Sequence, residues 1–266
     1  MANVVITGGT NGIGKALAER LAAEGDRVVV VGRSAVAPAG AELVRGDLTT
    51  VAGTTAVADE VAARFDVLDH LVLGAGWFTP RRLVTPDGLE HGFALYAMSR
   101  YLVVERLLPL LDQAKTPVVA HLCGVAGLRG HGIQWDDLAL ERKYSPFRAT
   151  MQAARAVDLL GAGFADRHPG SAVRCVLHNP MVVDTGLGRQ VGGPLGRLTD
   201  LSARLFGRTP EQAADQVRPF LANPPAAPLT ASRAGKPVDL RRPEFDRESA
   251  ARLYRVLAGI TAGAGA

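Results

Sequence analysis

The 266-residue chain is poor in cysteine and in unbalanced charge, and each shortage excludes a class of protein. Its two cysteines, Cys123 and Cys175, stand in apolar runs. We therefore expect buried thiols in a reducing compartment and no disulfide framework. The formal net charge is +4 and no basic run exceeds two residues, which argues against a nucleic-acid partner.

Long hydrophobic runs and metal-ligand spacings are lacking as well. The longest apolar stretch, Tyr101 to Leu111, is interrupted by Glu105 and Arg106 and is too short to span a bilayer. No charged segment and cleavage site precede the first strand, so no secretory signal is expected. The six histidines are not spaced like helical metal ligands. We expect a cytoplasmic protein with no metal and no membrane partner.

The sequence does contain a regular alternation of apolar strands and amphipathic helices. Strands are expected at about 3–6, 27–31, 42–44, 70–73, 118–122 and 173–177, with helices at about 51–64, 89–112 and 146–167. Continuous apolar strands are typical of sheets buried on both faces. The alternation predicts an α/β fold, a Rossmann-type doubly wound parallel sheet, as one domain over 1–266. Glycines and prolines after Pro180 predict a substrate lid around 181–225.

A glycine-rich turn directly follows the first strand and opens a helix. Gly8 permits a tight turn, Gly12 lets the backbone approach a pyrophosphate, and Gly14 allows close packing of helix on sheet. The helix N-terminus then offers free N–H groups to phosphates. The turn predicts a dinucleotide site made by Gly8, Thr10, Asn11, Gly12, Ile13 and Gly14.

The end of the second strand carries a hint about the nucleotide. An NAD-preferring fold places an acidic residue there for the ribose hydroxyls, whereas this chain has Arg33 and Ser34. A guanidinium followed by a hydroxyl suits a 2′-phosphate, so NADP(H) is favoured over NAD(H). The alternative is that Arg33 is a surface arginine stacking on adenine.

These motifs resemble the short-chain dehydrogenase/reductase family over nearly the whole chain. The resemblance is carried by Thr7-Gly8-x3-Gly12-x-Gly14, by Asp47-Leu48 and by Asp69-x-Leu71-Val72-Leu73-Gly74-Ala75-Gly76. Asp137-Leu138, Lys143-Tyr144-Ser145 and Pro243-Glu244-Phe245 are similar to its retinol-dehydrogenase-like branch. The resemblance implies adenine contacts from Asp47 and Leu48, and further cofactor contacts from Gly74, Ala75, Gly76, Pro180 and Thr185.

The chain departs from this family at the acid–base residues. The resemblance puts Gly124, Thr150 and Ala154 at the positions of the family's serine, tyrosine and lysine, and Tyr96 at that of its asparagine. None of the four lysines follows a tyrosine by four residues, so the tyrosine–lysine pair is absent under any alignment. A phenol with a pKa of about 10 is a poor acid at neutral pH without a neighbouring cation.

Four other residues are candidate catalytic groups. Tyr96 and Tyr144 each stand four residues before an arginine, whose guanidinium can stabilise a phenolate, although a tyrosine at a helix entrance more often packs. His178 and Asn179 follow a strand end where open sheets bind ligands. A turn-stabilising role for both is an equal alternative.

Three functions are open at this point. The lost residues beside a preserved phosphate turn favour a non-redox enzyme of specialised metabolism, such as a cyclase, isomerase or dehydratase, in which NADP(H) is structural. The second is an NADP-dependent oxidoreductase of a ketone, alcohol or enone with another proton donor. The third is a non-catalytic sensor of NADP or a metabolite. A small-molecule substrate is expected, and family likeness of helices 89–112 and 146–167 implies a homodimer.

Overall fold

The computed structural model describes residues 1–126, 132–184 and 207–263, with Gly193, Gly196, Arg197, Leu201 and Leu205. These residues build an eight-stranded sheet in the order β3-β2-β1-β4-β5-β6-β7-β8, in which β8 alone runs antiparallel to its neighbour. The strands are β1 (Asn3–Thr7), β2 (Arg27–Gly32), β3 (Glu42–Arg45), β4 (His70–Leu73), β5 (Val118–Leu122), β6 (Arg174–Asn179), β7 (Leu229–Arg233) and β8 (Lys236–Pro237). The expected doubly wound parallel sheet is therefore present.

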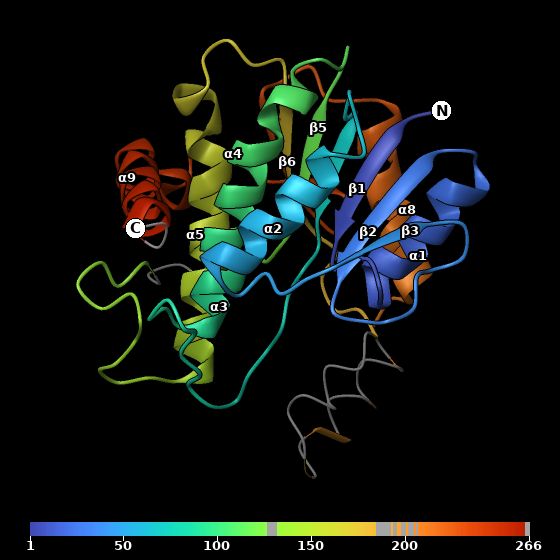
Figure 1. Ribbon diagram of the computed structural model, residues 1–266. Coiled ribbons are helices and arrows are strands. Elements are labelled where there is room, and N and C mark those ends of the chain that lie inside the picture. The colour runs from blue at the N-terminus through green and yellow to red at the C-terminus, as the bar shows by residue number, and fades with distance from the viewer. Residues whose placement is uncertain are drawn as a thin grey trace.

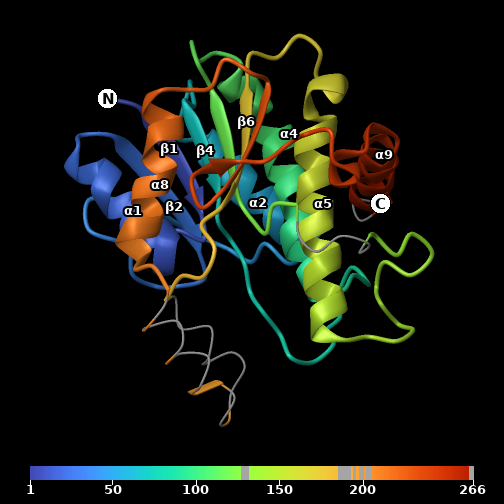
Figure 2. The same ribbon diagram turned by 180° about the vertical axis from the view of Figure 1, so that it is seen from behind.

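Helices cover both faces of this sheet. Helices α1 (Gly12–Ala23) and α8 (Pro210–Ala222) share one face, in front of the sheet in Figure 2. Helices α2 (Val51–Ala62), α4 (Ser99–Leu111) and α5 (Pro146–Arg167) cover the other, as Figure 1 shows. The central strands are mostly apolar because both of their faces are buried. None of the described helices has the length and apolar character needed to cross a membrane.

The region expected as one helix over 89–112 is divided into three parts. Helix α3 (His91–Phe93) passes into a π-helical turn, η1 (Ala94–Met98), and then into α4. The π turn carries Tyr96. Single π turns inside helices occur often at functional sites, because they re-aim a side chain.

Helix α8 corrects the expected lid around 181–225. It begins with a capping box between Thr209 and Gln212, and it packs against α1 with Val217 and Leu221 buried. Residues 210–222 are thus part of the core, and β7 extends the sheet directly after them. Thr185, and most of the segment between Asp184 and Gly207, lie outside the described residues.

The C-terminal helix α9 (Arg247–Gly263) covers the outer side of α5, preceded by the short 3₁₀ turn η2 (Pro243–Phe245) (Figure 1). The Tyr254 hydroxyl donates a hydrogen bond to the Leu160 carbonyl at 2.9 Å, and its ring packs on Gly163. The stretch of α5 from Gln152 to Gly161 is buried within the chain. Helix α9 therefore covers part of α5, one of the two helices on which a homodimer was expected, and the homodimer stays a prediction.

Candidate active site

A cavity of about 520 Å³ opens at the carboxyl ends of β1, β2, β4, β5 and β6. The strand order reverses between β1 and β4, and open α/β sheets bind ligands at such a point. The expected cofactor residues lie on its wall, apart from Ser34 and the undescribed Thr185: Gly8, Thr10, Asn11, Gly12, Ile13, Gly14, Arg33, Asp47, Leu48, Gly74, Ala75, Gly76 and Pro180.

The turn between β1 and α1 has no room for a side chain at Gly8 or at Gly14. Gly8 has a φ of +71°, and a Cβ there would lie 2.6 Å from the Ala75 backbone nitrogen. At Gly14 a Cβ would lie 2.4 Å from the Gly8 carbonyl oxygen. The backbone is therefore brought close to the cavity, as a bound diphosphate requires.

The first turn of α1 offers N–H groups to an anion. The Asn11 side chain accepts the Gly12 N–H at 2.9 Å, and the Lys15 N–H bonds to the Asn11 carbonyl. Within the described part of the chain, no hydrogen bond engages the N–H groups of Ile13 and Gly14. These residues fit the diphosphate of a dinucleotide, because free N–H groups at a helix N-terminus bind phosphate.

Three polar residues gather at the other end of the cavity, after β2 and β3. Arg33, Asp47 and His91 line it together. Burial lowers the pKa of His91, with a smaller lowering from Arg33, while the carboxylates of Glu90 and Asp47 oppose the shift. Ser34 does not reach the cavity, because its hydroxyl is engaged in a local turn with the backbone of Val36.

A second, smaller pocket of about 210 Å³ adjoins the nucleotide cavity and is mostly apolar. The two share the residues Trp77, Phe78, Tyr96, Leu122, Cys123 and Gly124. Thr150 and Ala154 line this pocket, and a Cβ at Gly124 would lie 3.4 Å from the Ala154 Cβ. The three positions where the resemblance expects serine, tyrosine and lysine thus border one apolar space.

Tyr96 and Cys123 are the ionisable residues that line both spaces. Burial raises the pKa of Tyr96, and the neighbouring Arg100 guanidinium only partly offsets it. Burial also raises the pKa of Cys123 far above its usual range. Both groups therefore keep their protons at neutral pH, so they can donate a hydrogen bond but lose a proton poorly.

Tyr96 and Arg100 do meet, as their spacing on a helix suggests. The Arg100 guanidinium carbon lies 5.0 Å from the centre of the Tyr96 ring. Its Nη2 donates to the carbonyl oxygens of Leu122 at 2.8 Å and Ala75 at 3.3 Å. A Cβ at Gly76 would lie 2.2 Å from the Tyr96 hydroxyl oxygen, so glycine there leaves room for this ring.

Two candidate acids lie away from both spaces. His178 is fully buried, with its ring 5.7 Å from that of Phe220 on α8, and burial lowers its pKa to about 4. Tyr144 donates to the Thr79 carbonyl at 3.3 Å and is absent from the lining of either space. Asn179 does line the cavity, but its Oδ1 accepts the Met181 N–H at 2.8 Å in a turn.

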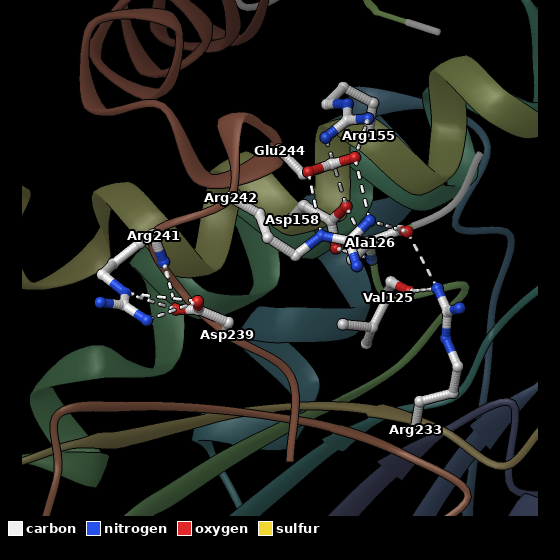
Figure 3. A network of polar contacts seen from close by, with 9 residues as sticks. All are labelled: Val125, Ala126, Arg155, Asp158, Arg233, Asp239, Arg241, Arg242 and Glu244. Atoms are coloured by element: carbon white, nitrogen blue, oxygen red, sulfur yellow. Dashed lines mark hydrogen bonds and ion pairs between the residues drawn. The ribbon is translucent and has the colours of Figure 1, made fainter. Parts of the chain in front are cut away.

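The segment after β5 is fixed by a charged cluster (Figure 3). The Asp158 carboxylate accepts the Ala126 N–H at 3.1 and 3.2 Å, and Arg233 donates to the Val125 and Ala126 carbonyls. Burial raises the pKa of Asp158 to about 7. Arg155, Glu244 and Arg242 complete the cluster. The cluster thereby fixes the backbone of Val125 and Ala126, directly after Cys123 and Gly124, which border the site.

Sequence reasoning missed Trp77, Phe78 and His91 as site residues. Trp77 and Phe78 follow the glycines after β4 directly, a position that was a usable signal because strand ends line such sites. His91 reaches the cavity from α3, and no local pattern marks it. The described residues include no cluster of three or more histidine, cysteine, aspartate or glutamate side chains that could hold a metal.

Comparison with known proteins identifies the class to which this fold and site belong. The model of the short chain dehydrogenase family matches residues 2–135. Dehydrogenase/reductase SDR family member 12 of Bos taurus is 31% identical over 84% of this chain and 72% of its own length. The chain therefore belongs to the short-chain dehydrogenase/reductase family.

Within this family the chain is similar to the retinol-dehydrogenase-like branch. Human retinol dehydrogenase 13 is 29% identical over 71% of this chain and 61% of its own length. A solved NADP complex of RhlG from Pseudomonas aeruginosa, 22% identical, matches with a TM-score of 0.66 over 87% of this chain and 94% of that one. The expected family and branch are confirmed.

Proposed function

We propose that this protein binds NADP(H) in the larger cavity and converts a small apolar molecule in the adjoining pocket without serine–tyrosine–lysine catalysis. The conversion is non-redox: a cyclisation, isomerisation or dehydration. The observation that carries the proposal is the contrast between the two spaces. The nucleotide cavity keeps its glycine turn and free N–H groups, whereas Gly124, Thr150 and Ala154 border the pocket.

The nucleotide half of the proposal rests on the backbone and on Arg33. The N–H groups of Ile13 and Gly14 would bind the diphosphate, and Asp47 and Leu48 would border the adenine. Arg33 would bind a 2′-phosphate, because a guanidinium forms strong charge-assisted bonds with phosphate oxygens. RhlG, which shares this fold, was solved in complex with NADP, and that complex agrees with the assignment.

The proposal of a non-redox reaction rests on the protonation of Tyr96 and Cys123, which line both spaces. NADPH, when bound, supplies a hydride, and reducing a carbonyl then needs a group that gives up a proton. Burial raises the pKa of both Tyr96 and Cys123. These residues would orient a substrate oxygen by hydrogen bonds and exclude bulk water. The proton moved in a cyclisation, isomerisation or dehydration would then pass between groups of the substrate itself, with no hydride taken from the nucleotide.

One observation favours an oxidoreductase as the second candidate. Arg100 stacks on Tyr96, so a cation lies beside a phenol in the wall of the site. Tyr96 would then donate the proton, and the relatives named as dehydrogenases agree with this alternative. This alternative predicts that wild-type turnover with NADPH falls at alkaline pH, as Tyr96 loses its proton, and that Tyr96→Phe removes this turnover.

Calorimetric titration with NADP+ and NAD+ tests the nucleotide assignment. We expect NADP+ to bind more tightly, and Arg33→Gln to weaken NADP+ by roughly 10- to 100-fold while leaving NAD+ nearly unchanged. Arg45→Gln is the matched control, since Arg45 is an exposed arginine on the neighbouring strand β3 and does not line the cavity. Equal affinities for the two nucleotides, or equal effects of the two variants, would contradict the assignment.

A further inference from the structure

Two side chains from different strand ends meet at the mouth of the nucleotide cavity. Arg33 follows β2 and Trp77 follows β4, and both line the cavity. The Arg33 guanidinium carbon lies 5.0 Å from the centre of the Trp77 ring. This distance is within the range of a cation–π contact, so the indole is the surface on which this guanidinium rests.

The contact leaves the hydrogen-bonding edge of Arg33 available. Guanidinium N–H groups lie in the plane of the group, whereas an aromatic ring contacts its face. No carboxylate among the described residues pairs with Arg33. The Arg33 guanidinium therefore contacts the Trp77 ring with one face, and its N–H groups have no carboxylate partner in the described part of the chain.

Trp77 also belongs to the second space. Together with Phe78 it lines the apolar pocket, which Arg33 does not reach. The Trp77 side chain is 40% exposed, and residues 74–79 have no regular secondary structure that would fix it. Its position therefore depends on the side chains that it contacts, Arg33 among them.

We propose that Trp77 is a specificity-determining residue that holds Arg33 edge-on to the 2′-phosphate of NADP(H) and transmits its binding to the substrate pocket. The proposal rests on the proposed NADP(H) site. A 2′-phosphate bound to the edge of Arg33 would fix the guanidinium, and the fixed guanidinium would fix the Trp77 indole that lines the pocket. Because coupling between two sites is reciprocal, a molecule packed against Trp77 also strengthens NADP(H) binding.

The test is the ratio of the dissociation constants of NAD+ and NADP+, measured by calorimetry for the wild type and five variants. The ratio cancels any direct contact of Trp77 with the parts that the two nucleotides share. We expect Trp77→Leu to lower the preference for NADP+ by about 2- to 10-fold, because the ring support of Arg33 is lost. Trp77→Phe keeps a ring and should restore most of the preference.

Three further variants control this measurement. Trp135 makes the same kind of contact with Arg252, at 4.5 Å, and does not line either space, so Trp135→Leu should leave the ratio unchanged. Arg33→Gln should lower the ratio further than Trp77→Leu, and adding Trp77→Leu to it should change nothing more, because both act through one interaction.

The transmission to the pocket has its own readout. The chain has two tryptophans, so Trp135→Phe leaves Trp77 as the only indole. We expect 2′,5′-ADP, which carries no nicotinamide, to protect Trp77 from acrylamide quenching, whereas ADP protects it less. The difference should vanish when Arg33→Gln is added.

The outcomes separate the inference from the function on which it rests. An unchanged ratio in Trp77→Leu, with a lowered ratio in Arg33→Gln, would overturn the role of Trp77 and leave the NADP(H) site standing. Equal protection by ADP and 2′,5′-ADP would overturn the transmission. A ratio that Arg33→Gln does not lower would overturn the proposed NADP(H) preference itself.

Discussion

The two ends of this site are specified in different ways, and they differ in what the chain has kept. At the β1–α1 end the cavity is shaped by glycines and backbone N–H groups, with Gly8 and Gly14 packed so tightly that a Cβ would clash. At the β5–α5 end the family's chemistry depends on three side chains, where this chain has Gly124, Thr150 and Ala154. A backbone site is built into the fold, whereas a side-chain site can be lost by substitution without loss of the fold.

The largest effect should come from breaking the backbone end. Gly8→Ala places a Cβ against the Ala75 backbone at a φ of +71°, so we expect nucleotide affinity to fall by roughly 100-fold or more in calorimetry. Gly25→Ala is the matched control, because its φ of +93° is equally strained but a Cβ there meets nothing within 4 Å. Equal nucleotide affinity in the two variants would show that the turn does not shape the site.

A smaller effect, on stability, should come from Asp158 in the charged cluster that fixes the segment after β5. Burial raises the pKa of Asp158 from 3.8 to about 7, so the folded state binds more protons than the unfolded state between these values. This contribution to stability is present at low pH and is lost as pH rises through about 4 to 7. The asparagine in the Asp158→Asn variant cannot ionise. The Tm of the variant minus the Tm of the wild type should therefore increase by a few degrees from about pH 5 to pH 8.

Asp166→Asn is the control for this comparison. Asp166 lies on the same helix as Asp158, but it is exposed and paired with Arg247 at the surface. Its Tm difference from the wild type should not grow in this direction over the same pH range. A constant difference for Asp158→Asn would contradict the raised pKa of Asp158.

The smallest effect is expected at Tyr144. Its hydroxyl donates to the carbonyl of Thr79, which borders the smaller pocket, but Tyr144 itself lines neither space. We therefore expect Tyr144→Phe to change nucleotide affinity and any turnover by less than about 2-fold. Tyr96→Phe, within the wall, is the paired variant to measure beside it. Loss of turnover with Tyr144→Phe and not with Tyr96→Phe would reverse the assignment of the two tyrosines.

Much of the backbone end could be predicted from the sequence. The glycine turn, the apolar strands and the residues after each strand are local features, and they brought Gly12, Asp47 and Gly74 correctly to one cavity. At the end of β6 the sequence offered His178 and Asn179 together. Successive strand residues point to opposite faces, so only one could line the site, and the pattern did not say which.

What could not be predicted depends on contacts between distant segments. The packing of α8 on α1 places residues 210–222, part of the lid expected around 181–225, in the core, and α9 packs on α5. The π turn at Tyr96 and the contact between Arg33 and Trp77 have no local sequence signal. Each arises from the three-dimensional arrangement of elements that are far apart in the chain.

Hydride transfer tests the central claim most directly. The protein should be incubated with NADPH deuterated at either C4 position and with an extract of small apolar metabolites, and the products examined by mass spectrometry. The account predicts that a metabolite is converted in a protein-dependent way with no deuterium transferred to it, and that Gly8→Ala abolishes the conversion. Deuterium in any product, in amounts matching NADPH oxidation, would contradict the non-redox assignment.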